Sequence, residues 1–162
     1  MKITADFTGQ LAVFTMGNEE FGLGVGRIVE ILQDQECMAI PNMPDFLLGV
    51  IELRGRVIPV MDLRTRFGLE PGSRAKNRII ILKKGRERMG IRVDDVDEIL
   101  RLEDSHISEP PSIFRGIGAE YMEAIAKINK RMIVILNVDR LLSAGELTRM
   151  KEVLKHDAPD RP

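Results

Sequence analysis

Two apolar runs on either side of one charged turn dominate the pattern of hydrophobic and polar positions, and they lie within residues 46–63. Short runs of valine, isoleucine, leucine and phenylalanine favour a buried pleated surface. Between the runs, Leu53-Arg54-Gly55-Arg56 places a turn glycine between two cations. We therefore predict a β-hairpin with a charged tip, and we expect a partner to meet the chain at that tip.

The same pattern predicts two strands nearer the start of the chain. Residues 11–16 are apolar and are followed by the turn signal Gly17-Asn18. Apolar residues then alternate with three glycines and lead into the apolar residues 28–32. A period of two indicates a second strand, and its glycines favour a sharply coiled one.

The chain resembles itself at an offset of 68 residues. Residues 11–32 align with residues 79–100 with seven identities in 22 positions. The recurring residues are Gly17, Glu19, Gly22, Val25, Glu30, Ile31 and Leu32, which reappear as Gly85, Glu87, Gly90, Val93, Glu98, Ile99 and Leu100. At an offset of 75, residues 56–63 also align with residues 131–138. We infer an internal duplication of a small β unit.

The repeat predicts the organisation of the chain. We expect one domain over residues 1–162, with a first unit at about 11–69, a linker at about 70–77 and a second unit at about 78–142. Short strands with glycine turns point to an all-β fold of two small closed barrels, because closure removes exposed sheet edges. Two barrels side by side leave a groove that suits a helix or a ligand.

Two helical elements are expected beside these strands. Asp62 and Gly68 are placed to cap a short helical turn between them. Residues 143–156 read as a C-terminal amphipathic helix, in which Ser143 and Glu146 have capping-box spacing. One face of that helix would carry Leu147, Met150 and Leu154.

Composition narrows the class of protein. With 162 residues and 44% hydrophobic content, the chain can bury a core, and its net charge of −1 argues against a dedicated nucleic-acid binder. The single cysteine, Cys37, excludes an internal disulfide, and residues 1–6 lack the apolar region of a signal peptide. No apolar run is long enough to span a bilayer. We expect a cytoplasmic protein without membrane insertion.

The residues that most often carry catalysis do not assemble into a recognisable constellation. His106 and His156 lack further ligands at metal-binding spacing, and the carboxylates of residues 94–98 alternate between strand faces. The glycines at 22, 24 and 26 have the spacing of neither the dinucleotide-binding nor the Walker motif. Cys37 has no nearby histidine. We therefore expect no enzymatic activity, no metal and no cofactor.

A basic stretch leaves one alternative open. Small β-barrels often bind RNA, and this region could serve a nucleic-acid-binding double barrel. It consists of Arg54, Arg56, Arg64, Arg66, Arg74, Lys76 and Arg78. The chain has no tryptophan and only one tyrosine, and its phenylalanines do not fall between the basic residues, so stacking platforms for bases are scarce.

Several segments together resemble one known family. These are residues 13–22, 28–31, 49–64, 89–96 and 131–142. The most specific is Leu53-Arg54-Gly55 followed by Val57-Ile58-Pro59-Val60 and Asp62-Leu63-Arg64. In these motifs the chain resembles the CheW family of bacterial chemotaxis coupling proteins over about residues 10–143. The resemblance implies two SH3-like, five-stranded β-barrel subdomains.

The resemblance also implies a function. Members of the family are adaptors without catalysis that join transmembrane chemoreceptors to the histidine kinase CheA. The cytoplasmic tip of the receptor, a helical hairpin, enters the groove between the subdomains, and exposed barrel surfaces pair with the regulatory domain of CheA. The resemblance thus implies a cytoplasmic protein that is recruited to membrane-associated receptor arrays.

Site residues follow from the same resemblance. Glu30 and Arg54 match residues important for receptor coupling. The positions in or beside that surface are Val25, Ile28, Gly49 and Gly55. The CheA contact is expected on the second subdomain and is not assigned to residues. Glu52 departs from the family, which commonly has asparagine there, and strand alternation would place its carboxylate on the same face as Arg54.

Overall fold

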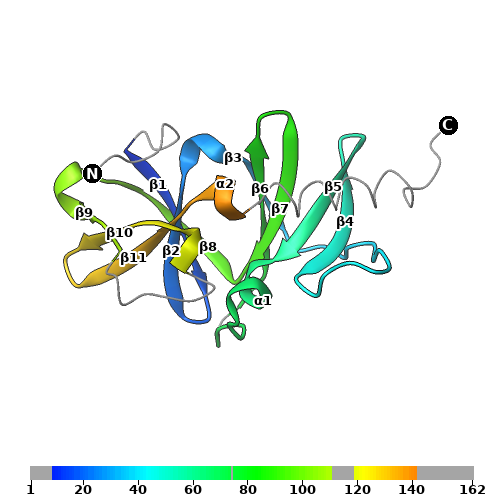
Figure 1. Cartoon of the computed structure of the whole chain (residues 1–162), viewed down its shortest axis with the longest axis horizontal. Coiled ribbons are helices and arrows are strands. Elements are labelled where there is room, and N and C mark those ends of the chain that lie inside the picture. The colour runs from blue at the N-terminus through cyan, green and yellow to red at the C-terminus, as the bar shows by residue number, and fades with distance from the viewer. Residues whose placement is uncertain (1–8, 74, 111–118, 142–162) are drawn as a thin grey trace.

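The computed structural model describes residues 9–73, 75–110 and 119–141. Figure 1 shows two β-sheets side by side, with two short helices between them. Sheet A contains, in spatial order, β8 (Asp95–Arg101), β1 (Gln10–Met16), β2 (Glu19–Gly24), β11 (Arg131–Leu136), β10 (Met122–Ile128) and β9 (Ile107–Ser108). Sheet B contains β3 (Ile28–Gln33), β6 (Arg78–Lys84), β7 (Glu87–Val93), β5 (Arg56–Asp62) and β4 (Leu47–Leu53).

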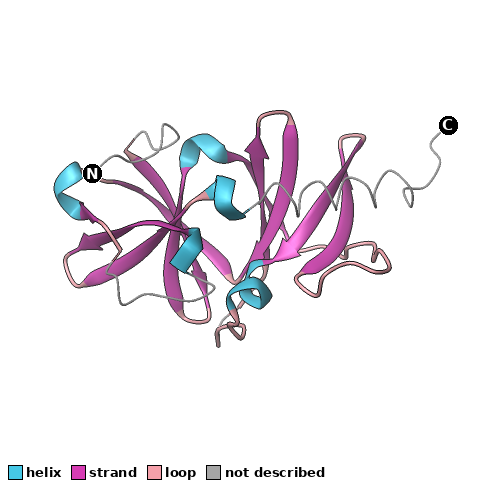
Figure 2. Cartoon of the chain, in the orientation of Figure 1, coloured by secondary structure: helices cyan, strands magenta, loops and turns pink. Residues whose placement is uncertain are grey.

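The helices within the described residues are all short (Figure 2). They are the α-helices α1 (Leu63–Phe67) and α2 (Val138–Leu141) and the 3₁₀ turns η1 (Val25–Arg27), η2 (Asp104–His106) and η3 (Ala119–Tyr121). The prediction of an all-β fold is therefore confirmed, although sheet A has six strands rather than five because of the two-residue β9. The expected C-terminal helix at 143–156 lies outside the described residues.

The internal repeat appears as a structural duplication. At the offset of 68, the first three strands β1, β2 and β3 fall on β6, β7 and β8, and at the offset of 75, β5 falls on β11. The duplication extends to the pairing, because each copy contains one parallel pair: β11 runs parallel to β2 and β5 runs parallel to β7. The predicted repeat is thus matched in both strand order and strand pairing.

The two sheets do not coincide with the two halves of the sequence. Strands β1 and β2 belong to the first half, yet they lie in sheet A among strands of the second half. Conversely, β6 and β7 complete sheet B beside β3, β4 and β5. The division into contiguous units at 11–69 and 78–142 was therefore wrong for the sheets. Each sheet is completed by a hairpin from the other half, because the three remaining strands of sheet B, or the four of sheet A, would leave open edges.

The predicted hairpin and helical turn are both present. Strands β4 and β5 pair antiparallel from Leu53 opposite Arg56, and Arg54 and Gly55 form the tip with φ of 50° and 80°. A positive φ at both central residues is typical of the two-residue turns that connect the strands of a β-hairpin. Helix α1 begins after Asp62, whose carboxylate accepts the Arg64 N–H at 3.0 Å, and ends at Gly68 with φ of 69°.

The predicted second strand is interrupted. Strand β2 ends at Gly24, the turn η1 follows, and β3 begins at Ile28 in the other sheet. A Cβ atom on Gly22 would lie 2.5 Å from the Leu11 side chain, so this glycine allows β2 to approach β1 closely. The glycine-rich pattern therefore marks a crossover between sheets rather than one coiled strand.

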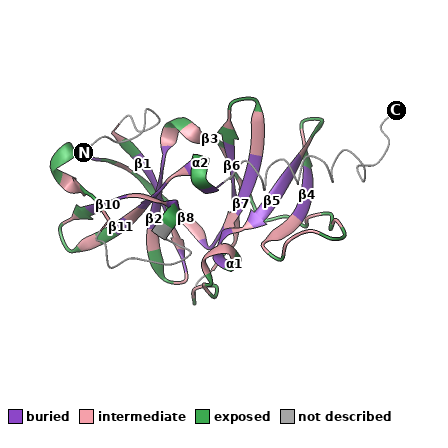
Figure 3. Cartoon of the chain, viewed as in Figure 1, coloured by how far each residue is buried: buried purple, intermediate pink, exposed green. Residues whose placement is uncertain are grey.

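The largest hydrophobic core joins the two sheets (Figure 3). From sheet A it includes Phe14 and Leu23, and from sheet B it includes Leu82 and Ile91. All four side chains are fully buried, with 0% exposure. Smaller cores lie under each sheet separately. Because apolar burial is continuous across the junction, each sheet contributes to the stability of the other.

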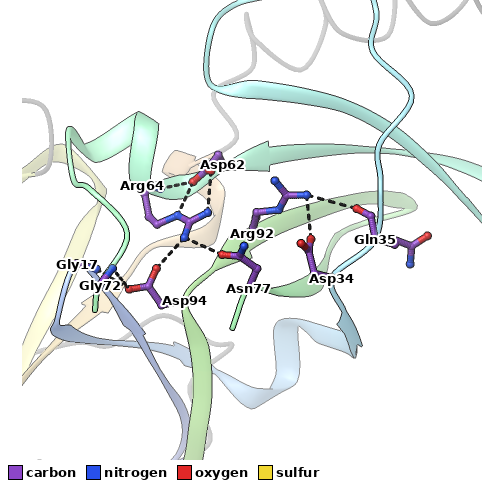
Figure 4. Close-up of polar contacts among 9 residues, drawn as sticks. All are labelled: Gly17, Asp34, Gln35, Asp62, Arg64, Gly72, Asn77, Arg92 and Asp94. Atoms are coloured by element: carbon purple, nitrogen blue, oxygen red, sulfur yellow. Dashed lines mark hydrogen bonds and ion pairs between the residues drawn. The ribbon is translucent and has the colours of Figure 1, made fainter. Parts of the chain in front are cut away.

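A buried ion pair reinforces this junction (Figure 4). The Arg64 guanidinium on α1 contacts Asp94, between β7 and β8, at 2.9 Å, and both side chains are at most 5% exposed. The same guanidinium donates to Asp62 at 3.0 Å and to Asn77 at 2.8 Å. Although burial opposes the charged form, the hydrogen bonds to Asp62 and Asp94 raise the pKa of Arg64 above its ordinary value.

The other oxygen of the Asp94 carboxylate binds the backbone of two turns. It accepts N–H groups from Gly17, in the β1–β2 turn, at 2.9 Å and from Gly72 at 2.7 Å (Figure 4). The partners of this carboxylate therefore come from helix α1, from the β1–β2 turn of sheet A and from the segment between α1 and β6. A buried carboxylate with this many donors is fully compensated, so the network fixes how these segments meet.

Candidate partner-binding site

An ion pair between Glu30 and Arg54 lies at the centre of the candidate site. Glu30 is on β3, and Arg54 is at the β4–β5 tip. One guanidinium nitrogen of Arg54 binds one carboxylate oxygen of Glu30, and the other nitrogen lies 3.4 Å from the second oxygen. The Arg54 side chain is 73% exposed and that of Glu30 is 24% exposed. The pair therefore presents a fixed charge to solvent.

This contact explains how distant segments are brought together. Strands β3 and β4 are the two outer strands of sheet B, so the Glu30–Arg54 contact joins the two ends of the sheet. A second bond acts at the same tip, since Arg56 donates to the Arg86 carbonyl at 2.8 Å in the β6–β7 turn. The hairpin tip is thus held by two arginines that serve different partners.

The apolar members of the expected site are next to Glu30 in the chain. Val25 is the first residue of η1 and Ile28 is the first residue of β3, and both are half-buried. Ile28 packs against the large core that joins the sheets. Because Val25 and Ile28 are only half-buried, each side chain leaves part of its apolar surface accessible to a partner.

The two glycines of the expected site act differently. Gly49 is buried with φ of 143°, and a Cβ atom there would lie 2.1 Å from the Met38 carbonyl oxygen. Met38 forms an isolated bridge with Val50, and its side chain is 60% exposed. Gly49 therefore shapes the surface through Met38 rather than by direct contact, whereas Gly55 faces open space at the tip.

The strand alternation that was expected to place Glu52 on the same face as Arg54 does not extend to Arg54. Strand β4 ends at Leu53, so Arg54 lies in the turn and strand alternation does not apply to it. Its guanidinium instead reaches Glu30, 24 positions away in sequence. Alternation failed here because a turn residue with positive φ redirects its side chain.

Sequence reasoning missed several exposed residues near this surface. Val29, Ile31 and Met38 are 41%, 44% and 60% exposed, although large apolar side chains favour burial. Alternation along β3 could have indicated Val29 and Ile31, because they lie on the face opposite Ile28 and Glu30. The pair Arg27 and Asp139, which meets at 2.5 Å, left no sequence signal because its members are 112 positions apart.

The basic stretch does not form a continuous cationic patch. Arg64 is buried in the junction network, and Lys76 and Arg78 each lie 3.5 Å from the Asp95 carboxylate. Nucleic-acid binding needs several cations directed at phosphates. Arg74 lies outside the described residues. Since these cations face carboxylates within the chain, the structure offers no support for the nucleic-acid alternative.

Arg66 has an apolar environment. Its guanidinium carbon lies 4.4 Å from the centroid of the Phe46 ring and 5.0 Å from that of Tyr121. Phe46 precedes β4 in sheet B, and Tyr121 precedes β10 in sheet A. A cation between two aromatic rings is stabilised by their negative faces. Arg66 therefore serves the contact between the sheets.

The surroundings of the candidate catalytic residues Cys37 and His106 do not favour catalysis. Burial raises the pKa of the Cys37 thiol, which disfavours the nucleophilic thiolate. His106 accepts the Glu103 N–H at 3.1 Å and caps η2. Among the described residues, no group of three or more histidine, cysteine, aspartate or glutamate side chains could hold a metal ion. His156 lies outside them.

The acidic run at 94–98 is divided among different partners. Asp94 is buried in the junction, while Glu98 lies 3.3 Å from Arg131. Burial, followed by repulsion from Asp95 and other carboxylates, raises the pKa of Asp97. Hydrogen bonding to Glu20 raises the pKa of Arg131 above its ordinary value. Arg131 on β11 therefore pairs with carboxylates from β2 and β8 of sheet A.

An apolar cavity of about 400 Å³ lies on sheet A beside α1. Its walls are formed by Phe21, Phe67, Leu69, Met122, Met132, Val134 and Leu136, and two acidic residues, Glu19 and Glu20, lie at its edge. Met132 is 52% exposed. Methionine side chains adapt to different apolar shapes. Sheet A and helix α1 thus form an apolar surface that does not include Glu30 or Arg54.

No helix in the described ranges has the length and apolar character needed to cross a membrane. Two coupled β-sheets, an exposed ion pair and apolar surfaces define a protein whose described surface is suited to binding other proteins. A family model, the CheW-like domain, matches residues 10–146. This match spans most of the sequence, and the chain therefore belongs to the CheW-like family.

Individual relatives agree with this assignment. The chain is 33% identical to "Chemotaxis protein CheW" of Klebsiella aerogenes over 156 residues, which cover 95% of this chain and 94% of that protein. It is 28% identical to the protein of the same name from Treponema pallidum over 146 residues, covering 87% and 86%. The chain is thus similar over nearly its full length to chemotaxis proteins.

A solved structure supports the fold. The scaffolding protein TtCheW from Thermoanaerobacter tengcongensis superimposes with a TM-score of 0.77 at 34% identity, covering 85% of this chain and 90% of that one. The family assignment and the two-sheet fold therefore rest on agreeing sequence and structural comparisons.

Proposed function

We propose that this protein is a non-enzymatic adaptor that couples chemoreceptors to the histidine kinase CheA. It would act in the cytoplasm and be recruited to membrane-associated receptor arrays. The observation that carries the proposal is the exposed Glu30–Arg54 pair beside the half-buried Val25 and Ile28. A receptor helix offers apolar anchors with charged flanks, and this surface combines the two complementary features.

Two partners require two surfaces. The receptor side is proposed around Glu30 and Arg54, with Val25, Ile28, Gly49 and Gly55 forming or shaping its surroundings. The CheA side is proposed on the second half of the chain, most of whose strands lie in sheet A. The exposed Ile99 and Met132 on that sheet support this division, since exposed apolar side chains are common at interfaces.

A titration with a purified receptor-tip fragment tests the receptor side. Replacing Arg54 by alanine, or reversing the charge with Glu30→Arg, removes the fixed ion pair. Loss of a central charged contact should weaken binding by roughly 1 to 3 kcal/mol. Circular dichroism should show an unchanged fold, because Arg54 is on the surface.

Arg56→Ala is the matched control. Arg56 belongs to the same hairpin tip, but it donates to a backbone carbonyl rather than to Glu30. We expect its affinity for the fragment to stay close to that of the wild type. Unchanged affinity in both Arg54→Ala and Glu30→Arg would remove these residues from the receptor site.

A further inference from the structure

The duplicated chain crosses between its sheets at two equivalent places. The first crossing, from β2 to β3, is η1 (Val25–Arg27). At the offset of 68 its equivalent is residues 93–95, where the chain passes from β7 to β8 and Asp94 is buried. The two crossings can therefore be compared directly, since they connect equivalent strands in opposite directions.

Each crossing is tied to a short helix by an arginine–aspartate pair. Asp94 contacts Arg64 on α1 at 2.9 Å, and Arg27 contacts Asp139 on α2 at 2.5 Å. At the offset of 75, Arg64 and Asp139 occupy equivalent positions, because α1 follows β5 and α2 follows β11. The same connection is thus built twice with the charges reversed.

The two pairs differ in burial. Arg64 and Asp94 are 5% and 4% exposed, whereas Arg27 is 11% exposed and Asp139 is 51% exposed. An exposed ion pair contributes little to global stability, but it can select among local conformations. Hydrogen bonding to Arg27 lowers the pKa of Asp139, so the carboxylate is charged at neutral pH.

The first crossing has few other anchors. None of the three residues of η1 is buried, and its N-cap residue, Gly24, provides no side-chain hydrogen bond. Arg27 anchors η1 by polar contacts. Its Nε donates to the Lys83 carbonyl on β6 at 2.9 Å, and the other end of its guanidinium binds Asp139. One side chain therefore connects η1 to β6 of sheet B and to helix α2.

We propose that Arg27 and Asp139 form a positioning clasp, which holds η1 so that Val25 and Ile28 keep the geometry that receives the receptor tip. This inference rests on the proposed function and adds a residue from α2 to the determinants of the receptor site. Val25 lies two positions before Arg27 and Ile28 directly follows it. Any shift of Arg27 therefore moves both apolar residues.

Charge reversal and charge exchange test the clasp. The variants Arg27→Asp and Asp139→Arg each replace an attraction by a repulsion, and the double variant restores the pair with opposite polarity. The probe is a purified helical-hairpin tip fragment of a chemoreceptor, titrated by calorimetry. Each single variant should bind roughly three- to tenfold more weakly. The double variant should bind more tightly than either single variant, although an aspartate at position 27 does not restore the bond to the Lys83 carbonyl.

Amide hydrogen exchange provides a readout that does not depend on the fragment. Exchange at residues 25–28 should increase in both single variants and return toward the wild-type rate in the double variant. Glu98→Arg is the matched control, because it breaks a 3.3 Å pair with Arg131 on sheet A and Glu98 is 41% exposed. That control should change neither exchange at residues 25–28 nor binding.

Different results separate this inference from the proposed function. Wild-type binding by both single variants, with weak binding by Arg54→Ala, would overturn the clasp and leave the receptor site in place. Binding by the double variant no tighter than by the weaker single variant would also overturn it, since the restored ion pair would then have no effect on the site. Equal binding by wild type, Arg54→Ala and Glu30→Arg would contradict the receptor site on which the clasp rests. In that case, unchanged exchange at residues 25–28 in the single variants overturns the clasp as well.

Discussion

Gly49 and Gly55 show how the same residue type serves two purposes within one hairpin. Both have positive φ, at 143° and 80°. At Gly49 the Met38 backbone occupies the space that a side chain would need, whereas at Gly55 nothing lies within 4 Å. One glycine therefore permits a close approach of two segments, and the other only permits a turn.

Alanine substitutions should separate these roles. Gly55→Ala adds only the strain of a left-handed backbone, about 1 kcal/mol of unfolding free energy. Gly49→Ala adds a clash with the Met38 carbonyl and should cost considerably more, because the Met38–Val50 bridge must open. Urea unfolding of the two variants measures the difference. A loss at Gly49 no larger than that at Gly55 would contradict the role of Gly49.

Residue contacts were the least predictable level of this structure. Resemblance identified Glu30 and Arg54 individually, but the pattern of residues gave no reason to pair them across 24 positions. Strand alternation even assigned Arg54 a different neighbour, Glu52. Hydrophobic periodicity indicates which face of an element is buried. It carries no information about which distant side chain forms an ion pair with a given residue.

Helix α1 is the element that most depends on the junction network. Removing the guanidinium with Arg64→Met leaves the Asp94 carboxylate buried with only backbone donors. Breaking a buried pair in this way should cost about 3 to 5 kcal/mol in unfolding free energy. Urea denaturation provides the measurement.

Arg131→Met is the control for that substitution. Arg131 pairs with Glu20 and Glu98, but its side chain is 34% exposed, so its loss should change stability by about 1 kcal/mol or less. If Arg64→Met were no more destabilising than Arg131→Met, the buried network would not hold the junction.

Elements were predicted better than contacts, for a physical reason. The repeat, the hairpin at 46–63 and the capped turn after Asp62 each have local signals, namely alternation, a turn glycine and capping residues. The break at η1 was missed, because alternate glycines fit a coiled strand as well as a crossover. The partner of a strand is a long-range property, so the exchange of β1 and β2 into sheet A was not predictable from alternation.

At the scale of the whole molecule, exchanged strands make the two halves interdependent. Residues 1–77 would retain β3, β4 and β5 without β6 and β7, and residues 78–162 would lack β1 and β2. Each fragment alone should therefore give little cooperative unfolding, because its sheet is incomplete. Mixing the fragments should restore β-sheet circular dichroism and a cooperative transition.

The intact chain is the reference for that experiment. A fragment of residues 1–77 that unfolds cooperatively by itself would contradict the interdependence of the sheets. It would instead support contiguous subdomains, the arrangement that the repeat alone had predicted. The fragments thus test the topology rather than the family assignment.

Coupling itself is tested most directly by co-sedimentation of purified CheA with membranes that contain a chemoreceptor, with and without this protein. The account predicts that adding the protein greatly increases the CheA in the membrane pellet, and that Arg54→Ala reduces this gain while Arg56→Ala does not. Equal sedimentation of CheA in the presence and absence of the protein would contradict the proposal that it links receptor and kinase.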